Sequence, residues 1–226
     1  MIVLEHVVKR YRSARGKGEN HNGRLVLDDI DLTIPRDAKL ALIGGNGAGK
    51  STLLNLIGGM DMPTRGSITR HCRVSWPLGL SGGFQGSLSG AQNMRFIARI
   101  HGVAEARLAE KIDFVRTFSE LGAALDLPVK TYSSGMRSRL AFAASLGFDF
   151  DTYLVDELTA VGDAAFRKKS RRAFADLASR AGLIMVSHDE RTLRDFCDSA
   201  LWLHEGKAQY FDRLEDGLAR YTEQHS

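Results

Sequence analysis

Residues 44–51 read G-G-N-G-A-G-K-S and match the pattern G-x-x-x-x-G-K-[ST]. In such a run, successive backbone N–H groups wrap a chain of phosphates, and the glycines let the backbone come close to it. Lys50 would neutralise the β- and γ-phosphates, and the hydroxyl of Ser51 is a ligand for Mg²⁺. We call residues 44–52 the phosphate loop; its candidate binding residues are Gly44, Gly45, Asn46, Gly47, Ala48, Gly49, Lys50, Ser51 and Thr52.

A pair of acids follows an apolar run much further along the chain. Residues 152–157 read T-Y-L-V-D-E, which predicts a buried strand that delivers Asp156 and Glu157 at its end. Ligands of α/β proteins bind at the carboxyl ends of the strands. We expect Asp156 to hold Mg²⁺, directly or through water, and Glu157 to polarise the attacking water as general base. Two acids with no catalytic role could also follow a buried strand, and only the presence of the phosphate loop favours the catalytic interpretation.

Two further features fit the same chemistry. His188 ends the next apolar run, L-I-M-V-S at 183–187, and could donate a hydrogen bond to the γ-phosphate or orient the water. Residues 132–136 read Y-S-S-G-M at the start of a helical stretch. There Ser133 could cap the helix, and the neighbouring N–H groups could bind an anion. Taken alone, a lone histidine and a serine cap are more often structural.

Composition places the chain among soluble globular proteins. The 226 residues are 43% hydrophobic and 26% charged, which argues against disorder, a collagen-like repeat and a coiled coil. A net charge of +4 permits phosphate, nucleic acid or anionic lipid as partners and selects none of them. The two cysteines, Cys72 and Cys197, lack metal-ligand spacing and cannot form a disulfide framework, so we expect a reducing compartment. Nowhere do 18 apolar residues run together, so work at a membrane would go through a partner.

Strand-like and helix-like runs alternate through most of the chain, which predicts an α/β core with a parallel sheet. Residues 76–150 are mostly helical in pattern and contain no buried strand. We therefore expect a single domain, residues 1–226, with a core of about 1–75 and 150–226 and an inserted helical lobe of about 76–149. Predicted strands lie at 2–8, 25–34, 39–43, 67–70, 72–75, 199–204 and 207–211, and a basic amphipathic helix lies at 163–179.

The order of these motifs along the chain resembles that of the nucleotide-binding subunit of an ABC transporter. Y-S-S-G-M is similar to the family signature L-S-G-G-Q, which it matches at Ser133 and Gly135. The resemblance implies the ABC ATPase fold, with an N-terminal antiparallel β region beside a mixed or parallel sheet. It also implies ATP and Mg²⁺ as ligands.

The resemblance assigns two more binding residues. Tyr11, just before the first long loop, takes the place of the aromatic residue that stacks on adenine. Gln85 takes the place of the glutamine that touches Mg²⁺ and the water, although it lies closer to the helix at Ser89 than that glutamine normally does.

Four strings, at 74–79, 82–90, 130–142 and 160–163, are similar to the ATP-binding proteins that export capsular polysaccharide in Gram-negative bacteria. The resemblance implies an ATPase that forms a homodimer on ATP binding and powers an integral membrane permease of the ABC-2 type. The transported substrate would be a lipid-linked polysaccharide. The subunit would lie peripherally on the cytoplasmic face of the inner membrane, with no nucleic acid as partner.

Two other functions stay open from the sequence. Exporters of O-antigen or teichoic acid belong to the same superfamily, but many carry an extra C-terminal domain, and this chain ends 38 residues after His188. Soluble ABC ATPases that act on nucleic acid or ribosomes usually contain two tandem cassettes or a long coiled coil, and here there is one cassette.

Residues 76–90 form a glycine-rich stretch that carries the apolar residues Trp76, Leu78, Leu80 and Phe84. Exposed apolar groups on a loop often mark a docking surface, so we expect this stretch to contact the permease. The alternative is an active-site loop whose aromatic rings fold back into the core.

Overall fold

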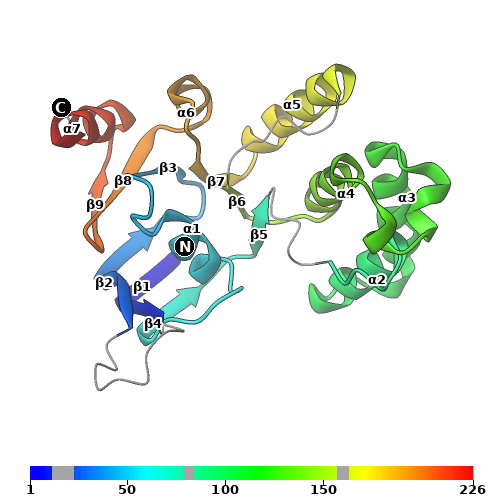
Figure 1. Cartoon of the computed structure of the whole chain (residues 1–226), viewed down its shortest axis with the longest axis horizontal. Coiled ribbons are helices and arrows are strands. Elements are labelled where there is room, and N and C mark those ends of the chain that lie inside the picture. The colour runs from blue at the N-terminus through cyan, green and yellow to red at the C-terminus, as the bar shows by residue number, and fades with distance from the viewer. Residues whose placement is uncertain (12–22, 79–83, 157–162, 226) are drawn as a thin grey trace. The chain divides into compact units, whose positions relative to one another are not determined.

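The computed structural model describes residues 1–11, 23–78, 84–156 and 163–225, in two compact units (Figure 1). The first unit holds residues 1–77, 150–157 and 181–226, and the second holds 78–149 and 158–180. The expected bounds of core and lobe stay a prediction. In the described part of the chain one segment groups differently, because residues 163–180 belong to the helical unit and not to the core.

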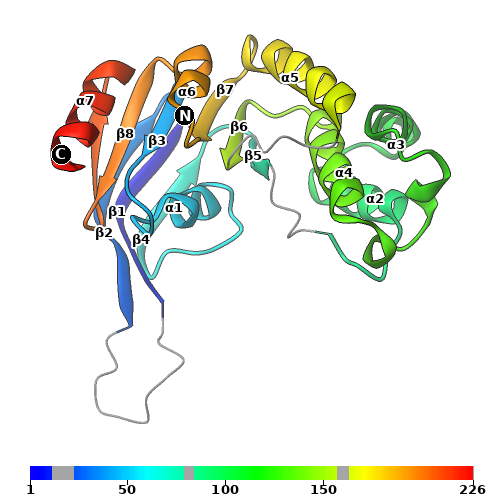
Figure 2. The same ribbon diagram turned by 45° about the horizontal axis from the view of Figure 1, so that its top comes forward.

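An antiparallel sheet of three strands opens the first unit (Figure 2). Its order is β2-β1-β4, and β1 pairs antiparallel with both neighbours. Alternation along β1 places Ile2 and Leu4 on the core side, and a register shift after Leu4 brings Val7 to the same side. The expected N-terminal antiparallel region is therefore confirmed. The strands are β1 (Ile2–Tyr11), β2 (Arg24–Ile34) and β4 (Arg65–Arg70).

A mixed sheet of six strands forms the centre of the first unit, in the order β5-β6-β7-β3-β8-β9. The pairs β6–β7, β7–β3 and β3–β8 are parallel, and β8–β9 is antiparallel. Strands β6, β7 and β3 therefore bring their carboxyl ends to one edge. The strands are β3 (Lys39–Ile43), β5 (Val74–Leu78), β6 (Thr152–Asp156), β7 (Gly182–Val186), β8 (Ser199–His204) and β9 (Lys207–Phe211).

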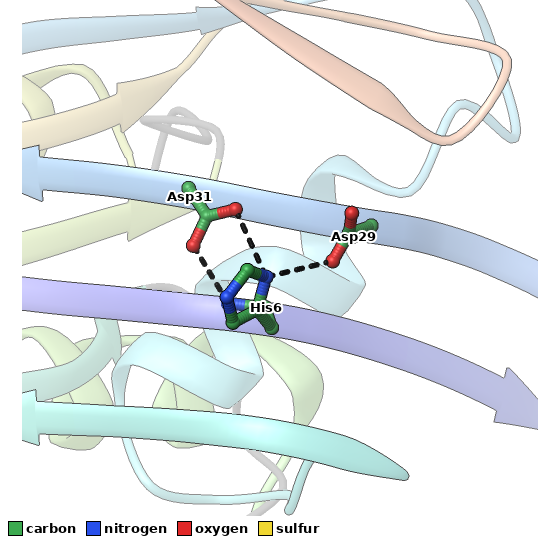
Figure 3. A group of neighbouring side chains, drawn as sticks. All are labelled: His6, Asp29 and Asp31. Carbon is green, nitrogen blue, oxygen red and sulfur yellow. Dashed lines mark hydrogen bonds and ion pairs between the residues drawn. The ribbon is translucent and has the colours of Figure 1, made fainter.

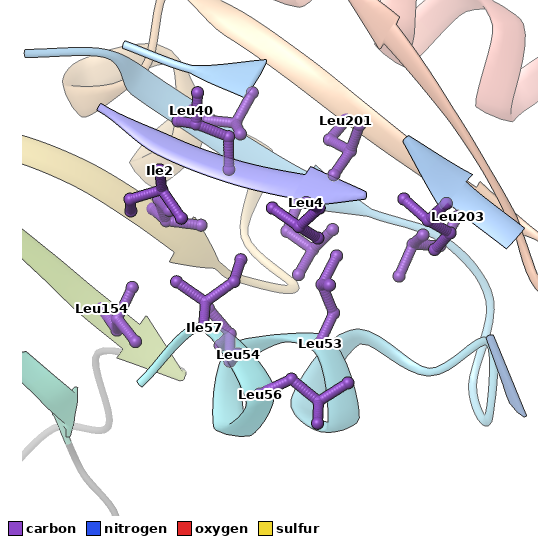
Figure 4. Close-up of a cluster of buried hydrophobic side chains, with 14 of the residues drawn as sticks. Ile2, Leu4, Leu40, Leu53, Leu54, Leu56, Ile57, Leu154, Leu201 and Leu203 are labelled. Carbon is purple, nitrogen blue, oxygen red and sulfur yellow. The ribbon is translucent and has the colours of Figure 1, made fainter. Parts of the chain in front are cut away.

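Helix α1 (Lys50–Ile57) begins within the phosphate loop and packs against both sheets through its apolar side chains. Figure 4 shows these side chains meeting residues of β1, β3, β6 and β8. Helices α6 (Glu190–Phe196) and α7 (Leu214–His225) pack on β7 and on β3, β8 and β9, respectively. The core that fixes α1 consists of buried aliphatic residues, among them Ile2, Leu4, Leu40, Leu53, Leu54, Leu56, Ile57, Leu154, Leu201 and Leu203.

The second unit is helical in its described part (Figure 1). Its aromatic core centres on Phe118, whose ring lies 6.1 Å from that of Phe142 and 6.0 Å from that of Phe166. Lys169 donates hydrogen bonds to the Phe118 carbonyl and to Glu120, both at 2.9 Å. These contacts explain why the basic helix groups with the lobe. The helices are α2 (Gly90–Ile100), α3 (Glu105–Ser119), α4 (Ser134–Gly147) and α5 (Ala164–Ala178).

The glycine-rich loop expected at 76–90 begins later than predicted, because Trp76 lies in a strand. Its contact with the permease stays a prediction. Strand β5 extends to Leu78, and the ring of Trp76 packs edge-on against Phe150 with centroids 5.4 Å apart. Trp76 therefore contributes to the first unit's packing, as the alternative interpretation allowed. Phe84 is half-buried, and Leu80 lies outside the described residues. Across the described ranges, no helix is long and apolar enough to cross a membrane.

Candidate functional site

The candidate site lies where three neighbouring parallel strands end. The phosphate loop follows β3, Asp156 is the last residue of β6, and His188 comes two residues after β7. Asp156 pairs in register with Val186, and β7 lies between β6 and β3. The topology therefore brings to one edge residues that lie more than a hundred positions apart in the chain, as the carboxyl-end rule predicts.

The backbone of the phosphate loop requires glycine at particular positions. Gly49 has φ of 103°, and an added Cβ would lie 3.0 Å from Val26 Cγ1. Gly44 has φ of 150°, and an added Cβ would lie 2.5 Å from the Leu203 carbonyl oxygen. Any side chain at these two positions would be strained or would clash, so this loop conformation requires glycine at both.

Lys50 is the first residue of α1 and closes the loop. Its Nζ donates hydrogen bonds to the Gly44 carbonyl at 2.7 Å and the Gly45 carbonyl at 3.0 Å. No side chain caps α1. The positive end of the helix dipole and the ammonium of Lys50 thus both lie at the loop, where they would stabilise the negative charge of a phosphate chain.

A cavity of about 440 Å³ brings most of the predicted residues of the first unit together. Gly44 lines a smaller neighbouring cavity of about 110 Å³, together with Lys50 and His188. Glu157 lies outside the described residues, so its assignment as general base stays a prediction. The larger cavity is lined by Tyr11, Arg24, Val26, Asn46, Gly47, Gly49, Lys50, Ser51, Thr52, Asp156, Val186 and His188.

The donor set fits a hard divalent cation beside the phosphates. The hydroxyl of Ser51 and the carboxylate of Asp156 belong to residues that line the same cavity. Mg²⁺ prefers oxygen ligands and is usually held by one or two carboxylates together with substrate phosphates. Ser51 and Asp156 are therefore the residues that would hold Mg²⁺.

Tyr11 is the last residue of β1 and also lines this cavity. It is 42% exposed, and its hydroxyl donates a hydrogen bond to Asp61 Oδ2 at 3.0 Å. An aromatic ring at the rim of a phosphate-binding cavity can stack on a base, which agrees with the role predicted for Tyr11.

The remaining predicted residues belong to the second unit. Ser133 caps α4, and its Oγ accepts a hydrogen bond from the Met136 N–H at 3.2 Å, as expected. The backbone of Gln85 is fixed by the buried side chain of Asn93, whose Oδ1 accepts from the Gln85 N–H at 2.8 Å. The side chain of Gln85 is exposed. The roles of Ser133, Gly135 and Gln85 toward a nucleotide stay predictions.

Arg24 is a cavity residue that the sequence did not single out. It begins β2 opposite Tyr11, and its Nη2 donates to the Gly47 carbonyl at 3.4 Å. Its position could have been found only from the β1–β2 register, because it lies 20 positions before the phosphate loop begins. A second cation therefore stands beside Lys50 in this cavity.

A separate group of titratable residues joins β1 to β2 (Figure 3). The imidazole Nδ1 of His6 lies 3.1 Å from Asp29 Oδ1 and 3.3 Å from Asp31 Oδ2. The backbone N–H of His6 donates to Asp31 Oδ1 at 2.8 Å. All three side chains are exposed, and both carboxylates interact with His6, at a register shift of the two strands. We assign this group to the strand pairing.

Comparison with known proteins supports the same family. The model of the ABC transporter family matches residues 27–160. The chain is 48% identical to the polysialic acid transport ATP-binding protein KpsT of Escherichia coli, over 98% of each chain. It is 44% identical to the capsule polysaccharide export ATP-binding protein CtrD of Neisseria meningitidis, over 98% of this chain and 99% of the relative. Export proteins for O-antigen and teichoic acid are more distant, at 36% identity or less.

A solved structure shares the fold. It is the dimeric, post-hydrolysis ATP-binding cassette MJ0796 bound to ADP and Pi, with a TM-score of 0.75 and 20% identity, over 95% of this chain and 99% of that one. The motifs, the strand-end cavity and the relatives agree, and the chain belongs to the ABC transporter family of ATPases.

Proposed function

We propose that this protein is the ATP-binding and ATP-hydrolysing subunit of an ABC-2 type transporter that exports capsular polysaccharide across the inner membrane. One observation carries the ATPase assignment: most of the phosphate loop lines one cavity at the strand ends together with Asp156 and His188. The full-length similarity to capsule-export ATP-binding proteins supports the choice of polysaccharide as substrate.

The predicted binding and catalytic residues divide this chemistry among them. Lys50 and the loop N–H groups bind the phosphates, and Tyr11 stacks on the base. When bound, Mg²⁺ neutralises charge on the β- and γ-phosphates. Glu157 accepts a proton from the attacking water, and His188 orients that water or donates a hydrogen bond to the γ-phosphate.

The site is completed by a second copy of the chain. Ser133 and Gly135 stand at the start of α4, where backbone N–H groups of a facing subunit would bind the γ-phosphate. The proposal therefore includes a homodimer that forms on ATP binding. Its other partner is an integral membrane permease, which binds the lipid-linked polysaccharide and holds this subunit at the cytoplasmic face of the membrane.

The variant Glu157→Gln tests the ATPase assignment. The amide keeps the size of the side chain but cannot accept a proton, so kcat should fall by about 10²–10⁴-fold while ATP affinity is retained. Glu110→Gln, an exposed carboxylate on α3, is the matched control and should hydrolyse ATP like the parent chain. Undiminished turnover in Glu157→Gln would contradict the general-base role.

Co-expression with candidate ABC-2 permeases tests the transport assignment. The subunit should co-purify with its permease from membranes, and Glu157→Gln should stop capsule export in cells. A cysteine placed at Phe84 should crosslink to the permease if the stretch before α2 is the docking surface. Co-purification with nucleic acid in a salt-sensitive manner would instead favour a soluble ABC ATPase.

A further inference from the structure

Lys9 is a charged residue that the first unit buries, at 8% exposure. Its ammonium donates to Asp61 Oδ1 at 2.6 Å and to the Met62 carbonyl at 2.7 Å. It also lies over the ring of Tyr11, 4.9 Å from the centroid. A buried ammonium is costly unless it is fully paired, so these partners fix the side chain in one position.

Asp61 connects this lysine to the aromatic ring at the cavity. Its Oδ1 accepts from Lys9 and from the Met62 N–H at 2.7 Å, and its Oδ2 accepts from the Tyr11 hydroxyl at 3.0 Å. The hydrogen bond from Lys9 is the main reason that the pKa of Asp61 lies below its ordinary value, against the opposing effect of burial. The carboxylate is therefore ionised at neutral pH, and its bonds to Lys9 and Tyr11 are charge-assisted.

The segment that carries Asp61 follows helix α1, whose other end bears the phosphate loop. This segment is bound to β1 along its length. The Thr64 N–H donates to the Val8 carbonyl at 2.7 Å, and the Arg10 N–H donates to Thr64 Oγ1 at 2.9 Å. The end of β1, and Tyr11 with it, is thus fixed to the helix that begins at Lys50.

The part of Tyr11 that these contacts leave exposed lines the cavity together with Asn46 and Gly47 of the phosphate loop. We propose that Asp61, itself held by Lys9, is a positioning residue that orients the Tyr11 ring as the platform for the nucleotide base. This inference rests on the proposed function, because it takes the ligand of the cavity to be a nucleotide.

Binding of ATP and of inorganic triphosphate to the full chain, measured by calorimetry, tests the inference. Inorganic triphosphate carries the phosphates and no base. Asp61→Asn and Tyr11→Phe should each weaken ATP binding about fivefold, the change expected for one lost hydrogen bond, and should leave triphosphate binding unchanged. Glu5→Gln is the control, because Glu5 is an exposed carboxylate on β1 that bonds Ser67 Oγ at 2.9 Å and does not line the cavity.

Two further measurements separate positioning from a merely structural role. In a Tyr11→Ala background, Asp61→Asn should cause no further loss of ATP affinity, because there is no ring left to orient. In steady-state hydrolysis, Asp61→Asn should raise KM with no loss of kcat, since the base does not take part in the reaction. A loss of kcat, or an equal loss of ATP and triphosphate binding, would overturn the inference.

The exposed position of Tyr11 lets Tyr11→Phe decide the matter even where Asp61→Asn does not fold. If the parent chain binds ATP and both variants bind it equally well, only the positioning role fails. A parent chain that binds neither ATP nor triphosphate would contradict the proposed function itself.

Discussion

Helices α1 and α4 both begin at a predicted binding motif, and their first turns are built in opposite ways. Helix α1 follows Gly49, which has φ of 103°, and no side chain caps it. Helix α4 follows Ser133 in an extended conformation, and the Ser133 Oγ accepts from the Met136 N–H. The first helix therefore offers its N-terminal N–H groups to a ligand, whereas the second satisfies one of them from its own sequence.

The glycines of the two motifs differ in the same way. An added Cβ at Gly49 would lie 3.0 Å from Val26 Cγ1, so the fold of the chain itself demands glycine there. An added Cβ at Gly135 would meet only Ser133 Oγ, at 3.9 Å. Nothing in the described structure around Gly135 requires a glycine. The conformation of the phosphate loop thus requires glycine within a single chain. The open space around Gly135 leaves room for a ligand bound to another subunit.

The largest effect that the comparison predicts is at the uncapped helix. Lys50→Ala should weaken ATP binding about a hundredfold, because it removes the charge-assisted hydrogen bonds to the β- and γ-phosphates. A fluorescent-nucleotide titration measures the change. Lys207→Ala, at an exposed lysine that pairs with Asp28 at 2.9 Å, is the control and should bind like the parent. Equal affinity of Lys50→Ala and the parent chain would show that the loop does not bind the phosphates.

Alanine substitutions at Gly49 and Gly135 should show which of the two glycines the fold itself requires. Gly49→Ala should lower the free energy of unfolding by about 1–3 kcal/mol, because a side chain at positive φ is strained and meets Val26. Gly135→Ala should change it by no more than about 0.5 kcal/mol, since there is space for the methyl group. Urea unfolding of both variants measures the two free energies. Equal destabilisation would contradict the claim that the fold requires glycine at position 49 and not at position 135.

The smallest effect concerns the cap of α4. Ser133→Ala should cost about 1 kcal/mol, which corresponds to a melting temperature lower by about 2–4 °C in a chain of this size. The neighbouring Ser134→Ala, inside the first turn and exposed, should leave the melting temperature nearly unchanged. A Ser133→Ala variant as stable as Ser134→Ala would mean that the cap contributes nothing.

The sequence predicts the parts of the fold that depend on local patterns. The strands at 199–204 and 207–211 have the predicted bounds, because alternation and flanking residues mark them. The cap at Ser133 was also predicted, since its residue type and the following helical pattern are both local. The phosphate loop was predicted for the same reason: its glycines are specified by backbone conformation.

What the sequence could not predict depends on pairing between distant segments. Arg24 reaches the cavity through the β1–β2 register, and Asp61 meets Tyr11 across 50 positions. Trp76 was expected on a loop because glycines follow it, but β5 extends past it, and its half-buried ring packs edge-on against Phe150. Helix α5 was placed in the core by its position in the chain, whereas Phe166 and Lys169 pack with Phe118.

We propose that the phosphate loop of one subunit and the Y-S-S-G-M motif of another form one site. Gel filtration with ATP and Mg²⁺, in a Glu157→Gln background that stops hydrolysis, tests it most directly. Gly135→Asp alone should bind ATP as a monomer and fail to dimerise, because its carboxylate would meet the triphosphate, and Lys50→Ala alone should also fail. Mixed together, the two variants retain one intact composite site, so ATP-dependent pairing should return in part. Normal ATP-dependent dimerisation of Gly135→Asp alone would contradict the account.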